Sequence, residues 1–182
     1  MLGVRHLTFE ELEAGLETIR QAPKTDGVLE LIVRRPRAGE RETLDEARLD
    51  VDEGLVGDRW KMHGLNRDTQ LNVMSARVIA LVAQEKERWP LAGDQLFIDL
   101  DLSIDNLPPG THLAIGTAVV EVTAEPHTGC AKFVSRFGLD ATRFVNSPLG
   151  RDLQLRGVNA RVVQSGVIRV GDVVRKTGAS TS

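Results

Sequence analysis

The sequence has almost no cysteine: Cys130 is the only one among its 182 residues. A single thiol excludes an intramolecular disulfide, and it excludes zinc or iron–sulfur sites built from several cysteines. Long apolar runs are also missing, since no window approaches the roughly 18 apolar residues of a membrane-spanning helix. The first residues carry charge in every turn and are unlike a secretory signal. We therefore expect a cytoplasmic protein with no membrane partner.

An excess of basic residues is absent as well. The 23 Lys and Arg stand against 26 Asp and Glu, which gives a net charge of −3 and argues against a generally basic, nucleic-acid-binding protein. Hydrophobic residues make up 41% of the chain and charged residues 27%, as in a globular protein with one core. Because no internal repeat or low-complexity linker divides the chain, a single α+β domain is the simplest interpretation.

Apolar periodicity predicts helices at 8–22, 76–89, 131–137 and 141–146. Thr8 and Glu11 form a capping box at the start of the first helix, and Ser75 caps the second. The charged stretch 37–46 is expected to be exposed. Short segments rich in branched residues and bounded by Gly or Pro predict strands at 27–35, 47–51, 68–75, 95–102, 111–116, 118–124, 159–164 and 172–176. So many short strands favour a closed or nearly closed barrel with flanking helices, mainly β in content.

Cys130 stands at the predicted start of a helix, after a turn that contains His127. The free N–H groups and partial positive charge of a helix amino terminus favour the thiolate. Lys132 and Arg136 add positive charge nearby, and His127 is a candidate proton acceptor or donor. Such a thiolate suits nucleophilic attack, soft-metal ligation or sulfur transport. The alternative is that Cys130 is a small buried hydrophobic residue, as many free cysteines are.

The chain resembles the MOSC domain, named for the carboxy-terminal domain of molybdenum cofactor sulfurases. The resemblance covers about residues 28–175 and implies a strand-rich barrel, preceded by a helical extension at 1–26; we expect the domain at 27–176 and a flexible tail at 177–182. Two departures are that Gly129 stands where many members have proline, and that His127-Thr128 replaces an Arg-containing approach. The motifs that carry the resemblance are the GLVGDRW segment, Gly93-Asp94, Leu107, Gly110, Leu113, Ile115-Gly116, the lone Cys130, and Gly157 through Gly171-Asp172.

The resemblance implies the molybdenum cofactor (molybdopterin) and a cysteine that carries sulfur as a persulfide or ligates molybdenum, a role that only Cys130 matches. A pocket for a phosphorylated pterin needs cationic donors around the thiol. The pyridoxal-phosphate domain of full-length sulfurases would need several hundred further residues, so we do not expect this chain to extract sulfur from cysteine by that chemistry. Asp58 is expected to orient Arg59 or His63. The candidate cofactor-binding residues are Arg59, His63, Arg67, Lys132 and Arg156, and the candidate catalytic residues are Cys130 and His127.

Sulfur transfer and molybdenum-dependent oxidoreductase chemistry are both open, and each implies a sulfur-donor, acceptor or redox partner protein. A non-catalytic module that binds an anionic ligand or a partner protein, with a structural Cys130, is the alternative from another class. A mononuclear zinc site would need Cys130, His127 and the distant His63. A Cys–His hydrolase would need an oxyanion motif that the sequence lacks.

Overall fold

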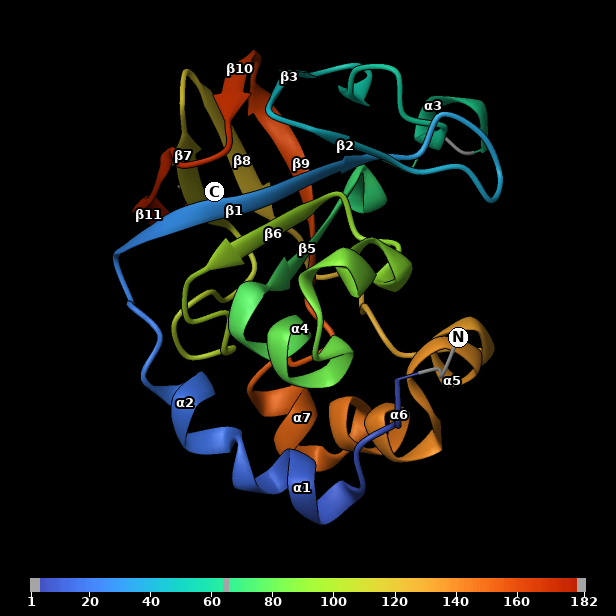
Figure 1. The fold of residues 1–182 in the computed structure, drawn as a ribbon. Coiled ribbons are helices and arrows are strands. Elements are labelled where there is room, and N and C mark those ends of the chain that lie inside the picture. Colours follow the sequence, from blue (N-terminus) through green and yellow to red (C-terminus); the bar gives the residue numbers. More distant parts are fainter. Residues whose placement is uncertain (1–3, 64–65, 180–182) are drawn as a thin grey trace.

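The architecture is a barrel of short strands with most of the helices gathered at one end of it (Figure 1). The computed structural model describes residues 4–63 and 66–179. The strands are β1 (Asp26–Arg34), β2 (Glu42–Leu44), β3 (Glu46–Asp50), β4 (Gly54–Leu55), β5 (Leu71–Ser75), β6 (Leu96–Asp99), β7 (Thr111–Ile115), β8 (Ala118–Val122), β9 (Val158–Gln164), β10 (Gly166–Arg169) and β11 (Val173–Ala179). The α-helices are α1 (Phe9–Ala14), α2 (Leu16–Arg20), α3 (Trp60–His63), α4 (Ala76–Ala83), α5 (Ala131–Phe137), α6 (Leu139–Asn146) and α7 (Pro148–Asp152), with 3-10 helices η1 (Arg67–Thr69) and η2 (Lys86–Ala92).

Seven strands form the barrel in the order β11-β7-β8-β9-β5-β6-β1, and the pairing of β1 with β11 closes it. This confirms the predicted barrel. β5 and β6 pair in parallel because α4 carries the chain back to the same end of the sheet between them. β2 extends the sheet beyond β1, and β10, β3 and β4 form a second, three-stranded sheet.

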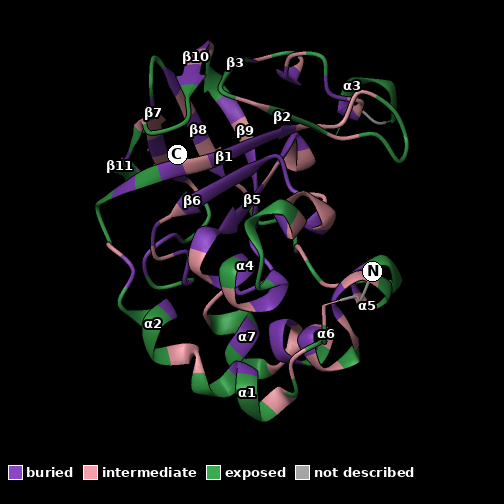
Figure 2. Ribbon diagram, in the orientation of Figure 1, coloured by how far each residue is buried: buried purple, intermediate pink, exposed green. Residues whose placement is uncertain are grey.

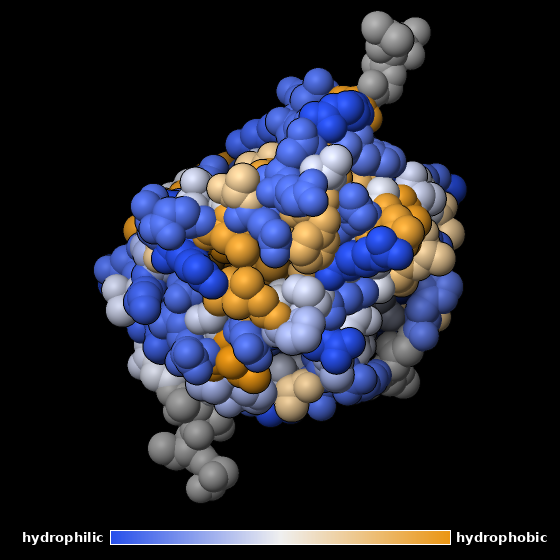
Figure 3. Space-filling model, turned by 90° about the horizontal axis from the view of Figure 1, so that it is seen from below, coloured by the Kyte–Doolittle hydropathy of each residue, from blue (hydrophilic) through white to orange (hydrophobic). Residues whose placement is uncertain are grey.

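Two apolar cores follow from the alternation of side chains along the strands. One face of the strands fills the barrel with Leu, Ile and Val side chains such as Leu29, Leu113 and Val162. The opposite face of β1, β5 and β6 packs against the helices through residues such as Met74 and Phe97. Figure 2 shows the buried residues along these strands, and the outer sides of α1 and α2 exposed. Viewed from the helical end, an apolar area remains among hydrophilic side chains (Figure 3).

Of the four predicted helices, α5 has the predicted bounds and α6 begins two residues earlier than predicted, whereas the two helices predicted nearer the amino terminus are shorter than expected. The capping box of Thr8 and Glu11 is confirmed, but the helix predicted over 8–22 is divided at Gly15 into α1 and α2. Ser75 caps α4 as predicted. However, α4 ends at Ala83, because Gln84 takes a positive φ of 67° and the chain continues as the 3-10 helix η2, which contains Pro90. Alternative turns of this kind leave the apolar periodicity intact, so periodicity alone does not reveal them.

The sequence did not predict β2, β10 or α7. β2 lies within the charged stretch 37–46, where Arg34 on β1 and Glu42 on β2 form an ion pair. At the carboxyl end, β11 continues to Ala179, three residues beyond the expected end of the domain; residues 180–182 of the predicted tail lie outside the described residues. Within the described ranges, no helix is long and apolar enough to cross a membrane.

Candidate functional site

Cys130 is the N-cap residue of α5, as the sequence predicted. Its thiol is exposed, so the interpretation of Cys130 as a small buried hydrophobic residue is wrong. α5 is held by Phe133 and Phe137, which are buried among the helices, and it ends at Gly138, whose φ of 95° is in the left-handed region that favours glycine. Phe133 and Phe137 thus anchor α5 to the core, while its N-cap residue, Cys130, faces solvent.

The surroundings of Cys130 lower the pKa of its thiol. The backbone N–H of Phe133 makes the largest contribution, opposed by partial burial, and the N–H of Lys132 adds to it. The positive charges of Arg156 and Lys132 lower the pKa further. Both N–H groups belong to the first turn of α5, where no earlier carbonyl accepts them. The thiol is therefore accessible and shifted toward the thiolate.

A buried network of Asp94, Arg156 and His127, called the Asp94 network below, lies next to the thiol. Asp94 has no exposed surface. Its Oδ1 accepts a hydrogen bond of 2.6 Å from Arg156 Nη1, and its Oδ2 lies 3.0 Å from His127 Nε2. Burial alone would raise the pKa of Asp94, but the charges of Arg156 and His127 and their hydrogen bonds lower it below its usual value. Asp94 is thereby held as a carboxylate.

Arg156 connects this network to α5. Its Nη2 donates to the Ala92 carbonyl at 2.9 Å, and its guanidinium lies 5.0 Å from the centroid of the Phe133 ring. Arg156 is only 7% exposed, and its Nε has no hydrogen-bond partner among the described residues. The following Gly157 has a φ of 111°, and a Cβ there would collide with the Val73 carbonyl. Glycine at this position therefore lets the chain approach β5 and brings Arg156 beside Asp94.

Asn146, at the end of α6, holds the residue before the cysteine. Its Oδ1 accepts the Gly129 N–H at 2.9 Å, and its Nδ2 donates to the Gly129 carbonyl at 3.1 Å. A Cβ on Gly129 would lie 3.2 Å from Val145 and 3.3 Å from Thr142. The close approach and the paired hydrogen bonds fix the backbone through which Cys130 is attached.

Four arginines, called the arginine group below, lie near one another, and two of them bond to the turn around Gly93. Arg35 Nη1 donates to the Gly93 carbonyl at 3.0 Å, and Arg136 Nη1 donates to the Leu91 carbonyl at 2.7 Å. Burial lowers the pKa of Arg41, and the charges of Arg136, Arg35 and Arg59 lower it further. The group consists of Arg35, Arg41, Arg59 and Arg136.

Only part of this charge is balanced. Asp58 binds Arg35 through both carboxylate oxygens, at 3.1 Å to Nε and 2.9 Å to Nη2. Within the described part of the chain, the guanidinium groups of Arg41 and Arg59 make no hydrogen bond or ion pair, and Arg41 Nε is buried without a partner. A group of cations with unused donors is the arrangement that binds oxyanions.

The structure brings some of the sequence candidates together and not others. Arg156 and Lys132 lie near Cys130, and His127 is joined to Arg156 through Asp94. Arg59 lies in the arginine group, but Asp58 binds Arg35 and so does not orient Arg59 or His63 as expected. Arg67 donates to the carbonyls of Val51 and Val162. His63 is exposed at the end of α3, next to the undescribed residues 64–65.

Sequence reasoning missed Asp94, Arg35, Arg41 and Asn146 as parts of the site. The sequence marks Gly93-Asp94 as a motif, but nothing in it indicates that Asp94 bonds to Arg156, 62 residues away. A cavity of about 470 Å³ adjoins the segment leading to Cys130 and is lined in part by His127, Asn146 and Arg156. Among the described residues, no three His, Cys, Asp or Glu side chains are grouped so as to hold a metal ion, so the suggested zinc set of Cys130, His127 and His63 is not assembled.

Comparisons with known proteins identify the family. A model of the MOSC domain matches residues 61–175. The fold is similar to that of the YuaD protein from Bacillus subtilis, with 18% identity, a TM-score of 0.61, and coverage of 82% of this chain and 94% of that chain. YiiM from Escherichia coli has 18% identity and a TM-score of 0.56, with 85% and 72% covered. No curated protein sequence matches the chain. Because the family model spans more than half of the sequence, the chain belongs to the MOSC domain family.

Proposed function

We propose that this MOSC domain holds a molybdenum cofactor, with the Cys130 thiolate as a protein ligand of the molybdenum. The MOSC family is associated with that cofactor. The observation that carries the proposal is the pairing of an exposed thiol of lowered pKa with a group of four arginines, two of which have no partner among the described residues. The turn at Gly93-Asp94 connects the two parts, since Gly93 bonds to Arg35 and Asp94 bonds to Arg156.

The residues present fit such a group. A pterin cofactor ends in a phosphate, which needs several donors carrying positive charge. Arg41 and Arg59 have unused donors, and the buried Arg41 Nε is a donor that costs free energy while it lacks an acceptor. A soft thiolate is a ligand that a soft metal ion prefers. When bound, the cofactor supplies a redox-active metal.

The other residues of the site hold these groups in place. Asp94 keeps Arg156 beside the thiol, where the positive charge stabilises the thiolate. His127 lies with Nε2 against Asp94 and is positioned to accept or donate a proton through its other ring nitrogen. Asn146 fixes Gly129 and hence the place of Cys130. Lys132 adds a screened positive charge at the open side of the site.

Sulfur transport is a second candidate function, favoured by the exposure of the thiol. In this reaction the Cys130 thiolate attacks the terminal sulfur of a donor persulfide, the donor's S–S bond breaks, and the donor leaves as a thiolate. Cys130 then carries the persulfide, and no electrons are gained or lost overall. The donor is a partner protein or small molecule bearing a persulfide, and an acceptor thiolate removes the sulfur in the reverse sense.

The experiment is to purify the protein, add the cofactor, and measure bound molybdenum and pterin for the wild type and for Cys130→Ser, Arg41→Gln and Arg59→Gln. We expect Cys130→Ser to lose molybdenum and the two arginine variants to lose pterin. Arg48→Gln, an exposed arginine on β3, is the matched control and should retain both. If the wild type binds neither, or if Arg48→Gln loses as much as Arg41→Gln, cofactor binding at this site is wrong.

Mass spectrometry and alkylation separate the remaining functions. Incubation with a small-molecule persulfide should add one sulfur atom to Cys130 if the domain carries sulfur, and Cys130→Ser should gain none. Alkylation rates measured against pH should give a thiol pKa below that of free cysteine. A slowly reacting thiol with an ordinary or raised pKa would instead favour a binding module in which Cys130 is structural.

A further inference from the structure

A cavity of about 400 Å³ lies where the two parallel strands end, and none of the residues of the Asp94 network or the arginine group lines it. β5 ends at Ser75, α4 follows at once, and β6 ends at Asp99, just before Leu100 and Asp101 of the cavity wall. The carboxyl ends of parallel strands and the amino terminus of the helix between them are where α/β units bind ligands. α2 and α7 supply the remaining walls through residues such as Ile19 and Leu153.

Two buried hydroxyls of the cavity wall have protons that no described residue accepts. Ser75 is 4% exposed and its Oγ accepts the Val78 N–H at 3.3 Å, while Ser103 is 8% exposed and its Oγ accepts the Asn106 N–H at 3.4 Å. Each hydroxyl acts as an acceptor within the protein and still has one hydrogen bond to donate. Because buried donors are normally satisfied, these two indicate that an acceptor enters from the cavity.

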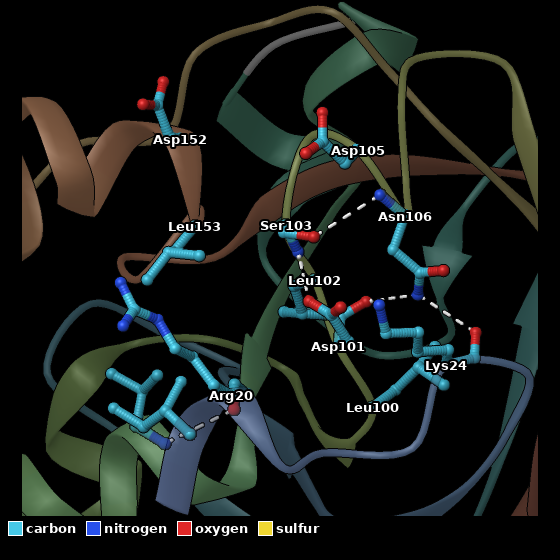
Figure 4. Close-up of a pocket in the computed structure, with 13 residues that line it drawn as sticks. Arg20, Lys24, Leu100, Asp101, Leu102, Ser103, Asp105, Asn106, Asp152 and Leu153 are labelled. Carbon is cyan, nitrogen blue, oxygen red and sulfur yellow. Dashed lines mark hydrogen bonds between the residues drawn. The ribbon is translucent and has the colours of Figure 1, made fainter. Parts of the chain in front are cut away.

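Positive charge lies on the same cavity. Arg20, in the last turn of α2, and Lys24, in the segment that follows, both line it, and neither side chain forms an ion pair with a described residue. Figure 4 shows the Arg20 guanidinium extending from α2 toward Leu153. Together with the amino terminus of α4 and the two hydroxyls, these cations suit a carboxylate.

Negative charge is also present, which argues against a simple anion. Asp101, Asp105 and Asp152 line the cavity. Asp101 Oδ1 accepts the Ser103 N–H at 2.9 Å, so its other oxygen is open to a ligand. In Figure 4, Asp101, Ser103 and Asp105 lie across from Arg20. Apart from Asn106, the rest of the lining is aliphatic, with Ile19, Val78, Leu100, Leu102 and Leu153.

We infer that this cavity binds a zwitterion with an aliphatic side chain, such as an aliphatic α-amino acid. Arg20, Lys24 and the serine hydroxyls take the carboxylate, the aspartates take the ammonium group, and the aliphatic wall takes the side chain. The loop that carries Asp101 and Ser103 is held by Asn106, whose Nδ2 donates to the carbonyls of Lys24 and Asp101 at 3.0 and 2.7 Å. The site is therefore built before the ligand arrives. It does not depend on Cys130 or on the proposed cofactor.

The test compares three probes of one carbon skeleton by NMR titration of the full chain. L-Leucine carries both charged groups, 4-methylpentanoate lacks the ammonium group, and 3-methylbutylamine lacks the carboxylate. We expect saturable shifts with L-leucine, centred on the amides of Ser103 and Asn106, and at least tenfold weaker binding of the other two. Arg20→Gln should weaken L-leucine at least fivefold and leave the amine unchanged, whereas Arg48→Gln, far along the chain on β3, should change neither.

Three results would overturn the inference. The first is no saturation by L-leucine at 20 mM. The second is equal affinity for L-leucine and either single-charge analogue, since recognition would then not require a zwitterion. The third is a Kd for L-leucine that Arg20→Gln leaves unchanged. Because the readout is amide shifts in the absence of any cofactor, each of these outcomes is independent of whether Cys130 binds molybdenum or sulfur.

Discussion

The barrel interior and the Asp94 network are both buried, but the barrel interior consists of aliphatic side chains and the network of charged ones. The barrel is filled by aliphatic side chains such as Leu113, Ile115 and Val162, each at most 1% exposed. The Asp94 network has a carboxylate with no exposed surface and an arginine that is 7% exposed. Aliphatic packing stabilises a fold through area and shape alone, whereas a buried ion pair depends on every partner being present.

The buried charges of the molecule mark the place where its thiol chemistry is concentrated. A buried ion pair contributes little net stability compared with an apolar replacement, because both charges lose their hydration. The barrel interior contains no such pair among its named residues, and the buried charges lie instead at Asp94 and Arg156, where Arg156 acts on the thiol. The comparison predicts that changes in the barrel alter stability alone, and that changes near Asp94 alter stability and thiol chemistry together.

The largest expected effect comes from Asp94→Ala. It leaves Arg156 buried beside Phe133 without its carboxylate, which costs about 3–5 kcal/mol of unfolding free energy in buried pairs of this kind. Urea unfolding measures the loss. Asp94→Asn keeps the size and one acceptor oxygen and should lose less. If Asp94→Ala were as stable as the wild type, Arg156 would not depend on Asp94, and the contrast with the barrel would be wrong.

The second effect comes from Asn146→Ala, which removes both hydrogen bonds to Gly129. We expect a loss of about 1–2 kcal/mol, because the Gly129 N–H and carbonyl are left without partners. We also expect a higher thiol pKa in alkylation, since Cys130 is then held less firmly against the first turn of α5. In unfolding free energy, Asn146→Asp, which keeps the acceptor and loses the donor, should fall between the wild type and Asn146→Ala. An unchanged alkylation profile in both variants would leave Asn146 with a purely structural role.

How much of this organisation the sequence predicts depends on the range of each contact. The barrel, Cys130 at the start of a helix and the caps at Thr8 and Ser75 follow from local periodicity and local hydrogen bonds. The partners of the charged residues do not. Asp58 accepts hydrogen bonds from Arg35, which lies 23 positions away. The guanidinium of Arg67 donates to two backbone carbonyls. The fold decides which distant residues pair. The sequence around a single arginine therefore does not distinguish an arginine of a binding site from one in an exposed loop.

The third effect tests the barrel side of the comparison. Ile115→Val, on β7, removes one methylene from a residue that is 1% exposed and should cost about 1 kcal/mol. Urea unfolding measures this cost, and alkylation of Cys130 provides the second readout. The alkylation pH profile should coincide with that of the wild type. A shifted profile would mean that barrel packing reaches the thiol, and the two regions would not be separable.

The smallest effect is expected from Lys132→Gln. The ammonium of Lys132 is exposed and is the last of the causes that lower the pKa of Cys130, whereas the backbone N–H groups of Phe133 and Lys132 remain in the variant. The thiol pKa should therefore rise only slightly, so that alkylation at a pH below the wild-type pKa becomes slower. Because surface charges are screened by salt, the difference between variant and wild type should shrink as ionic strength increases. Lys86→Gln, an exposed lysine on η2, is the control and should leave the profile unchanged. A large rise that persists at high salt would mean that the charge of Lys132 outweighs the helix N–H groups in stabilising the thiolate.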